Sequence, residues 1–204
     1  MDAHQQEIDS TVKKALQLAK ELEVSDKWQE VDTEPCLMYS MEVDDRVAAK
    51  GIATAPFSIK DIVTFLTPAQ NYFKFMESLK VNDLIHESNG IRVFYQVHKG
   101  MGPVSDRDFV CAGIVEPVGD NKLYMVIRSC DYPHKGEEGP VRGEMHLGAY
   151  IMEALGEKET KFTYISDFDL KGMIPGFIKN SVTKAEGKMA HTMIECMKKE
   201  GVGK

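Results

Sequence analysis

The chain has 204 residues, of which 43% are hydrophobic and 28% charged, and its formal net charge at pH 7 is -7. A chain of this length and composition fits one globular domain with a substantial buried core. The negative charge argues against nucleic acid as a partner, because phosphate binding requires a basic surface. It also argues against permanent adhesion to an anionic membrane, whereas brief contact through an apolar tip is compatible with it.

The N-terminus and the cysteines predict a cytoplasmic protein. The first 25 residues form a charged amphipathic pattern rather than a signal peptide, and no apolar run is long enough to cross a bilayer. The cysteines lie far apart and form no C-x-x-C pair, which is typical of free thiols in a reducing compartment. They are Cys36, Cys111, Cys130 and Cys196.

The first third of the chain alternates helices with short strands. Apolar residues recur at three- and four-residue steps near the N-terminus, which predicts an amphipathic helix. Turn-favouring and capping residues separate the segments that follow. In order, we expect a helix at about 2–23, a strand at 28–31, a hairpin of 37–43 and 47–54 around Asp44-Asp45, a helix at 59–66 capped by Ser58, and a short helix from Thr67-Pro68 to about 76.

After residue 76 the chain is mostly strand. The strongest hairpin signal is Asn89-Gly90 between two apolar runs. This order of elements predicts an α+β fold with one long, curved antiparallel sheet and helices on one side of it. Strands are expected near 79–88, 91–98, 107–117, 121–131, 141–154 and 161–170, with a further turn at Gly136 to Pro140.

The last forty residues end in an expected helix at about 175–200. Pro175 suits its first turn, where the missing N–H costs nothing. Gly187 is unusual in the middle of a helix, because it costs about 1 kcal/mol relative to alanine. The helix either packs as an ordinary cover on the sheet or closes a cavity for a variable apolar guest, which its adaptable methionines would suit. Its apolar stripe is Ile174, Ile178, Val182, Ala185, Met189, Met193 and Cys196.

The strands carry more apolar surface than a single helix stripe is expected to cover. Leu123, Met125 and Ile127 alternate with Tyr124 and Val126, so both faces of this strand are apolar. The pattern indicates a hollow interior or a binding partner.

No catalytic or metal-binding motif is present in the sequence. The six histidines have no metal-ligand spacing, and no H-E-x-x-H, G-x-S-x-G or phosphate-cradling glycine loop occurs. Glu153, Glu157 and Glu159 cluster near a turn and are expected to be solvated. We therefore expect a protein that is not an enzyme and that holds no cofactor and no metal.

Several stretches occur in the order of a known family. They are Pro103-Val104-Ser105-Asp106-Arg107-Asp108-Phe109-Val110, Arg128-Ser129, Val141-Arg142-Gly143-Glu144 and Asp169-Leu170-Lys171-Gly172-Met173-Ile174-Pro175 with Asn180, and Trp28, Tyr39 and Lys50-Gly51 accompany them. Over about residues 25–200 the chain resembles START domains, the lipid-transfer family named after the steroidogenic acute regulatory protein. The resemblance implies a helix-grip fold, in which the sheet wraps around a long C-terminal helix. It also implies one lipid in an internal hydrophobic cavity, with that helix as a lid.

The chain departs from the family at positions that touch ligands. In the sterol-binding branch a buried acid and a buried base fall near the positions of Phe94 and Gly113, but Ile91 to His98 contains no acid and Phe109 to Val115 no base, so we expect sterol not to be preferred. Phe75-Met76 replaces a W-D or W-N pair, which puts the headgroup contacts of phosphatidylcholine binders in doubt. Other headgroup candidates are Arg92, Gln96, His98 and His146, for which a structural role is the better interpretation, and Arg107 and Asp108 are expected to form a structural salt bridge.

We interpret residues 1–204 as a single START-like domain that binds a phospholipid or another single lipid and exchanges it with membranes as a monomer. The alternatives are a helix-grip enzyme acting on an enclosed apolar substrate, and a lipid-sensing interaction module. Apolar residues beside glycines, Met101, Met173 and Ile174, are the expected membrane contacts. The expected lipid contacts are Phe94, Met125, Ile127, Tyr150, Tyr164, Phe168, Phe177, Ile178, Met189 and Met193.

Overall fold

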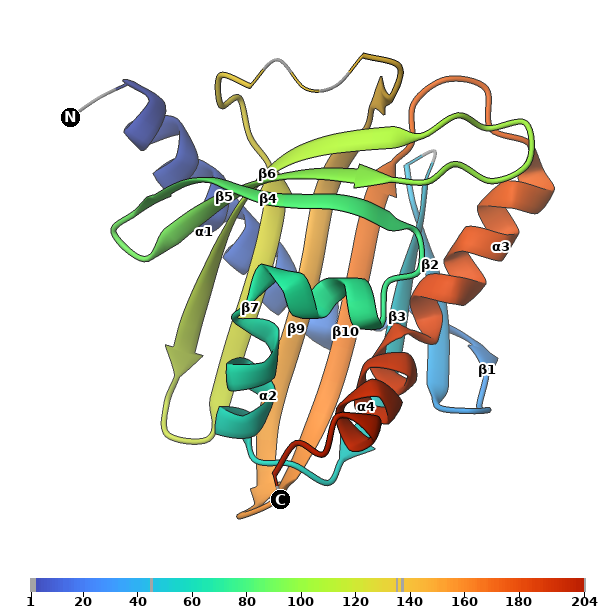
Figure 1. Cartoon of the computed structure of the whole chain (residues 1–204). Helices are drawn as coiled ribbons and strands as arrows, with labels where there is room; N and C mark the ends of the chain where they lie inside the picture. The colour runs from blue at the N-terminus through green and yellow to red at the C-terminus, as the bar shows by residue number, and fades with distance from the viewer. Residues whose placement is uncertain (1–2, 45, 135, 137, 204) are drawn as a thin grey trace.

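The computed structural model describes residues 3–44, 46–134, 136 and 138–203 (Figure 1). Asp2 of the expected first helix and Asp45 and Glu137 of two expected turns lie outside the described residues. None of the helices in the described part is both long and apolar enough to span a membrane. The elements are α1 (Ala3–Val24), β1 (Gln29–Asp32), β2 (Leu37–Val43), β3 (Arg46–Ala55), α2 (Ile59–Leu66), the 3-10 helix η1 (Ala69–Lys74), β4 (Leu79–Ser88), β5 (Ile91–His98), β6 (Arg107–Val118), β7 (Lys122–Ser129), β8 (Val141–Arg142), β9 (Glu144–Gly156), β10 (Glu159–Asp169), α3 (Gly176–Gly187) and α4 (Met189–Lys199).

The strands form one curved ten-stranded sheet in the order β1-β2-β3-β10-β9-β7-β6-β5-β4, with β8 paired to β6. All neighbours on this path are antiparallel, and only the short β8 pairs in parallel. The predicted hairpin between β4 and β5 is confirmed, because Asn89 and Gly90 both have positive φ, at 52° and 77°. A two-residue hairpin turn requires this conformation. The long, curved antiparallel sheet predicted from the sequence is thus confirmed.

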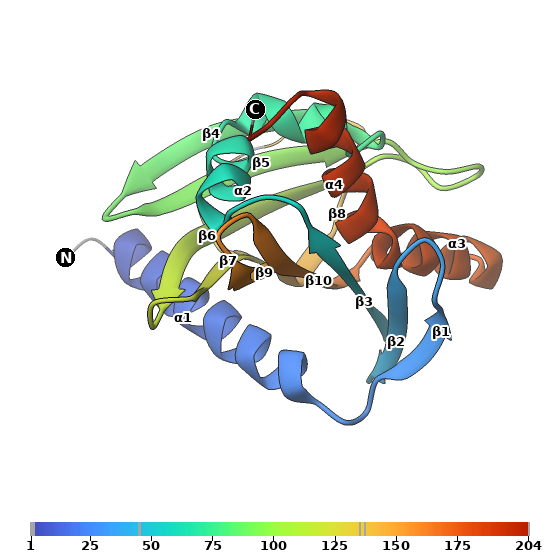
Figure 2. The same cartoon turned by 90° about the horizontal axis from the view of Figure 1, so that it is seen from below.

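Helices cover both faces of the sheet, which corrects the prediction that they all lie on one side. Figure 2 shows α1 on the side of the sheet opposite to α2 and α4. We call the face toward α1 the outer face and the other the inner face. Alternation along β7 explains the need for two covers: Tyr124 and Val126 pack with Ala15 and Ala19 of α1, whereas Met125 points inward.

The predicted cap at Ser58 is confirmed. The Ser58 hydroxyl accepts a hydrogen bond from the Asp61 backbone N–H at 3.1 Å, and the Asp61 carboxylate accepts one from the Ser58 N–H at 3.1 Å. This reciprocal pair satisfies backbone donors that a helix start leaves without partners. It fixes where α2 begins, and so where the chain covers the inner face.

The C-terminal segment forms two helices rather than the single long helix that was expected. The Cys36 thiol lies within 3.6 Å of the Gly187 carbonyl oxygen and receives a hydrogen bond from the His191 backbone N–H. In a continuous helix those two backbone groups would bond to each other. The inserted sulfur therefore separates α3 from α4 at Lys188, as side chains that enter a helical hydrogen-bond ladder do.

Close approach of β3 holds this break in place. A Cβ atom on Gly51 would lie 2.2 Å from the Gly187 carbonyl oxygen, so only glycine allows the strand and helix backbones to come this near. Gly187 itself is buried against Met38, where an added Cβ would meet side-chain atoms at 3.4 Å. The glycine that seemed unusual in the sequence is thus the last residue of α3, at a packed contact.

Candidate functional site

The inner face of the sheet is filled at one end and hollow at the other. At the filled end, α2, η1 and α4 pack on the strands (Figure 1). At the other end, a cavity of about 520 Å³ lies between the sheet and α3. Fully buried side chains at the filled end include Ile62, Met152, Phe162, Met193 and Met197.

Seven of the ten residues expected to contact lipid line this cavity. They come from four strands and from α3, so segments far apart in the sequence form one wall. Strand alternation explains why the six strand residues share this wall, because residues two apart on a strand lie on the same face. They are Phe94, Met125, Ile127, Tyr150, Tyr164, Phe168 and Ile178.

The other three expected contacts lie outside the cavity. Phe177 is 67% exposed at the start of α3. Met193 is fully buried in the packed cluster, and Met189 packs against that cluster. The expected apolar stripe assumed one continuous helix, whereas the break at Lys188 assigns the α4 methionines to the filled end.

Polar residues on the β4–β5 side of the cavity are bonded to protein groups. Gln96 donates to the Asn82 side-chain oxygen at 2.9 Å, and Asn82 donates to the Ala69 carbonyl at 3.0 Å. Arg92 donates to the Thr67 carbonyl at 3.1 Å, and His98 Nδ1 lies 3.1 Å from the Ser78 hydroxyl. Burial lowers the pKa of His98 to about 4, so its ring is neutral at pH 7. These contacts fit the structural roles proposed for Arg92, Gln96 and His98.

A cluster of three tyrosines and one acid stands where the cavity meets the packed core. Glu186 of α3 lines the cavity and accepts a hydrogen bond from the Tyr164 hydroxyl at 2.7 Å. The Tyr150 ring lies 5.1 Å from Tyr164 and 6.4 Å from Tyr72. Burial raises the pKa of Glu186, and it raises the pKa values of the three phenols too. Tyr150 and Tyr164 are buried, Tyr72 and Glu186 are half-buried, and all four line the cavity.

The sequence interpretation missed Glu186. Glu186 was not among the candidate residues of the last helix. Its position carries a detectable signal, because it follows Val182 by four residues and precedes Met189 by three, at the edge of the apolar stripe. The hydrogen bond with Tyr164 could be seen only once β10 and α3 were placed together.

The family motifs mostly serve as structural anchors. Arg107 does not pair with Asp108: it donates to the Leu170 carbonyl at 2.6 Å and to the Lys171 carbonyl at 3.2 Å. Asp108 instead forms a bidentate pair with Arg142 at 2.8 and 3.0 Å. These bonds tie the start of β6 to the turn after β10 and to β8.

Two other groups lie on the outer side of the fold. The Lys50 ammonium lies 4.5 Å from the Trp28 ring centre and 5.0 Å from that of Tyr39. The three residues that accompany the family motifs in the sequence therefore contact one another. His146 does not line the cavity, and its Nδ1 lies 3.8 Å from Glu144. His146 therefore does not contact a ligand in the cavity.

The expected membrane contacts stand at one rim of the cavity. Met173 is 99% exposed, Met101 is 47% exposed and also lines the cavity, and Ile174 is half-buried. The loop that carries Met101 contacts α3, because a Cβ on Gly102 would lie 3.7 Å from the Ile178 side chain. Leu170 and Ile178, which flank the turn of Met173 and Ile174 in the sequence, both line the cavity, so this turn also borders it.

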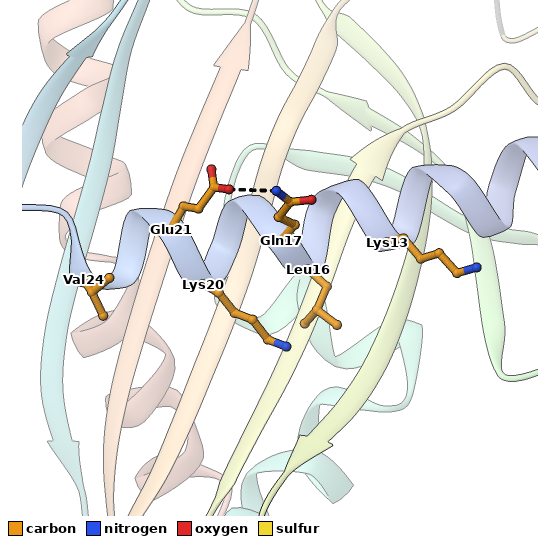
Figure 3. Close-up of a pocket in the computed structure, with 6 residues that line it drawn as sticks. All are labelled: Lys13, Leu16, Gln17, Lys20, Glu21 and Val24. Atoms are coloured by element: carbon orange, nitrogen blue, oxygen red, sulfur yellow. Dashed lines mark hydrogen bonds between the residues drawn. The ribbon is translucent and has the colours of Figure 1, made fainter.

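A second hollow, of about 480 Å³, runs along α1 (Figure 3). Figure 3 shows the six side chains that line it, all from this one helix, with Gln17 bonded to Glu21 at 2.9 Å. No second element of the described part of the chain lines it, and Val24 at its end is 79% exposed. It is a surface depression and not an enclosed ligand site.

A curved sheet that grips a C-terminal helical segment around an apolar cavity defines a helix-grip protein. The START domain family model matches residues 71–201, and the chain belongs to this family. No curated protein sequence matches it.

Solved structures of similar fold support the assignment. Human StAR-related lipid transfer protein 5 matches with a TM-score of 0.85 at 14% identity, over 97% of this chain and 99% of its own. Human STARD10 matches at 0.81 with 17% identity, over 93% and 80%. A STAR-related lipid transfer protein from Xanthomonas axonopodis matches at 0.68 with 18% identity, over 86% and 98%. At these identities the likeness concerns the fold.

Proposed function

We propose that this protein carries one lipid in the inner cavity and exchanges it with membranes, without catalysing a reaction. The observation that carries the proposal is the cavity of about 520 Å³, which is walled mainly by apolar side chains of the sheet and α3. Membership of a family whose structural relatives are lipid transfer proteins supports it. We take residues 1–204 to act as one domain and as a monomer in this role.

Apolar burial supplies the affinity. At about 25 cal/mol per Å², a chain of a dozen buried methylenes contributes roughly 10 kcal/mol before ordering costs. Phe94, Phe168 and Ile127 offer such a chain a wall that water solvates poorly. A lipid therefore gains more from this cavity than a polar metabolite would.

Exchange requires an opening, and the rim of Met101, Met173 and Phe177 is the proposed one. These side chains are exposed although they are apolar, and they flank the contact between the 100–104 loop and α3. An exposed apolar tip can enter the boundary region of a bilayer. Contact there would bring the cavity mouth to the membrane from which a lipid is taken.

The test is stopped-flow transfer of a fluorescent single-chain lipid between vesicles, comparing Met173→Asp and Phe177→Asp with the wild type. Each variant should slow transfer several-fold while the affinity for lipid in solution stays unchanged. Leu155→Asp is the matched control, since Leu155 is 54% exposed near the β9–β10 turn at the opposite end of the sheet (Figure 1). Equal slowing by the control, or no slowing by the rim variants, would contradict the membrane role of the rim.

The same experiments separate the carrier from its alternatives. An enzyme would convert its bound ligand, so native mass spectrometry after incubation would show a mass change. A lipid-sensing module would bind lipid without accelerating transfer above the spontaneous rate. The carrier returns the ligand unchanged and accelerates transfer in proportion to protein concentration.

A further inference from the structure

The acid at the inner end of the cavity is the feature that ligand carriage alone does not explain. Glu186 projects from the last turn of α3 into a cavity whose other walls are largely apolar. Tyr164 donates to one of its oxygens at 2.7 Å. The buried Ser166 hydroxyl lies beside the same carboxyl but makes no hydrogen bond of ordinary geometry.

Glu186 lacks the partner that a buried carboxylate needs. Burial raises the pKa of Glu186, and the neighbouring Tyr164 and Ser166 lower it. Among the described residues, no cation acts on this carboxyl to offset the cost of its charge. The polar groups across the cavity differ, because Gln96 and Asn82 satisfy each other. Buried charges in proteins are paired, hydrogen-bonded or neutralised by protonation. A carboxyl that is only half satisfied inside a ligand cavity is therefore open to a donor from the ligand.

The volume of the cavity limits the size of the ligand that can carry this hydrogen-bond donor. At about 30 Å³ per group, as in a liquid, a space of about 520 Å³ accommodates a chain of a dozen methylenes together with a small head. A phospholipid with two sixteen-carbon chains has on the order of 50 non-hydrogen atoms and would need a wider cavity, or chains that extend through the mouth. A lipid with one chain and a small head fits.

We propose that the cavity selects single-chain lipids whose small head carries a hydrogen-bond donor, a hydroxyl or an ammonium group, which binds Glu186 beside Tyr150 and Tyr72. This inference rests on the proposed carrier function and names its ligand class. The head lies at the inner end, against the packed core, and the chain extends along Phe94, Ile127 and Phe168 toward the rim. A fatty acid is disfavoured, because its carboxylate would meet a second carboxyl, and Arg92 of the cavity wall is already paired with Glu87 and bonded to the Thr67 carbonyl.

The test compares three ligands with one chain length, dodecanol, dodecylamine and dodecanoate, at pH 8 and below their micelle concentrations. Affinity is measured by displacement of N-phenyl-1-naphthylamine, and native mass spectrometry checks that one ligand binds per chain. Dodecanol and dodecylamine should bind the wild type at least tenfold more tightly than dodecanoate. Tighter binding of dodecylamine than of dodecanol indicates that the natural ligand has an ammonium head. Tighter binding of dodecanol indicates a hydroxyl head.

The Glu186→Gln variant should reduce the preference for dodecylamine over dodecanoate at least tenfold and change dodecanol binding less than threefold, since glutamine still accepts a hydrogen bond. Glu157→Gln is the matched control, because it makes the same charge change at an exposed turn and should keep the wild-type ranking. Tyr164→Phe provides a second variant, which frees the carboxyl from its hydrogen bond without removing it. That variant should retain the preference for donor heads.

Stability of the empty protein gives an independent readout. The titratable groups around Glu186 are Tyr164 of β10, which bonds to it, and Tyr150 of β9. Tyr72 of η1 lies next to Tyr150 and is acted on by the charge of Arg92, and burial raises the pKa of all three phenols. Because the folded pKa of Glu186 lies above its ordinary 4.5, its stabilising contribution is complete below pH 4.5 and is lost as pH rises through the folded pKa. Glu186→Gln should therefore melt higher than the wild type at pH 8 and show no advantage at pH 4.5.

Two results would overturn the inference while leaving the carrier function standing. One is dodecanoate binding as tightly as dodecanol in the wild type, and the other is a preference for dodecylamine over dodecanoate that Glu186→Gln leaves unchanged. Tight one-to-one binding of a two-chain phospholipid in preference to all three ligands would also overturn it. If no apolar ligand displaces the probe, the proposed carrier function itself fails.

Discussion

The two ends of the inner face are built on the same strands yet differ in how they are filled. Along β10, Phe162 is fully buried under α2 and α4, whereas Phe168, six residues further on the same face, borders the cavity. Along β9, Met152 and Gly148 show the same contrast. Strand alternation directs all these positions inward, so alternation cannot determine whether the space above them is occupied.

The difference lies in what covers each end. The filled end receives side chains from α2, η1 and α4, whereas the hollow end is covered by α3 and the 99–105 loop and only bordered by Val63, Leu66 and Tyr72 of α2 and η1. Where the two ends meet, the side chains change from apolar to polar, at Tyr150, Tyr164 and Glu186. A protein that must hold a guest can thus keep its stability at one end and its ligand space at the other.

The largest expected effect comes from replacing a phenylalanine with alanine at the filled end of the inner face and comparing it with the same replacement at the hollow end. Phe162→Ala should destabilise the empty protein by about 3–5 kcal/mol, because it opens a void in a close-packed cluster. Phe94→Ala should cost about 1 kcal/mol or less, since that side chain already borders empty space and loses little contact. Urea unfolding of both variants measures the difference.

The effects on ligand affinity should be the reverse of the effects on stability. Phe94→Ala should weaken dodecanol binding, while Phe162→Ala, studied at a temperature where it is folded, should leave that affinity within about threefold. Equal destabilisation by the two substitutions would mean that the two ends are packed alike.

A smaller effect is expected on the free energy of unfolding at acidic pH. The pKa of His98, lowered to about 4 by burial, lies below its ordinary 6.5, so the stability that comes from the neutral ring is present above pH 6.5 and is lost as pH falls toward 4. The loss should reach up to about 3 kcal/mol. His98→Gln should flatten the decline of unfolding free energy between pH 6.5 and 4, measured by urea titration at each pH. An unchanged slope would show that His98 is well solvated in the hollow end.

The smallest effects concern the glycine contact at the break between α3 and α4. Gly51→Ala should destabilise by about 1–3 kcal/mol, because its Cβ would meet the Gly187 carbonyl oxygen at 2.2 Å. Gly187→Ala has room against Met38 at 3.4 Å and should stabilise α3 by up to about 1 kcal/mol. Thermal melts of both variants separate the two cases.

Lipid exchange shows whether the break moves. If opening requires α3 to bend away at Lys188, Gly187→Ala should slow vesicle-to-vesicle transfer by up to roughly fivefold while affinity stays level or tightens. Unchanged transfer beside a raised melting temperature would exclude the lid motion and leave binding intact.

Local patterns determined most of the secondary structure and the family. The Asn89-Gly90 turn and the Ser58 cap are local devices, because the residues that form each one lie within a few positions of each other. The inward direction of Phe94 and Met125 also follows from strand periodicity. The motifs around Arg107 indicated the START family, and the matching family model confirms it.

Only the tertiary structure decided the break in the C-terminal segment, the extent of the cavity and the role of Glu186. Cys36 and Gly51 reach the helix across about 150 and 136 residues of chain, and the helix sequence alone contains neither contact. Glu186 has an acceptor role in the cavity because β10 brings Tyr164 to it. Periodicity specifies the direction of a side chain, whereas packing and hydrogen bonding depend on what distant segments place opposite it.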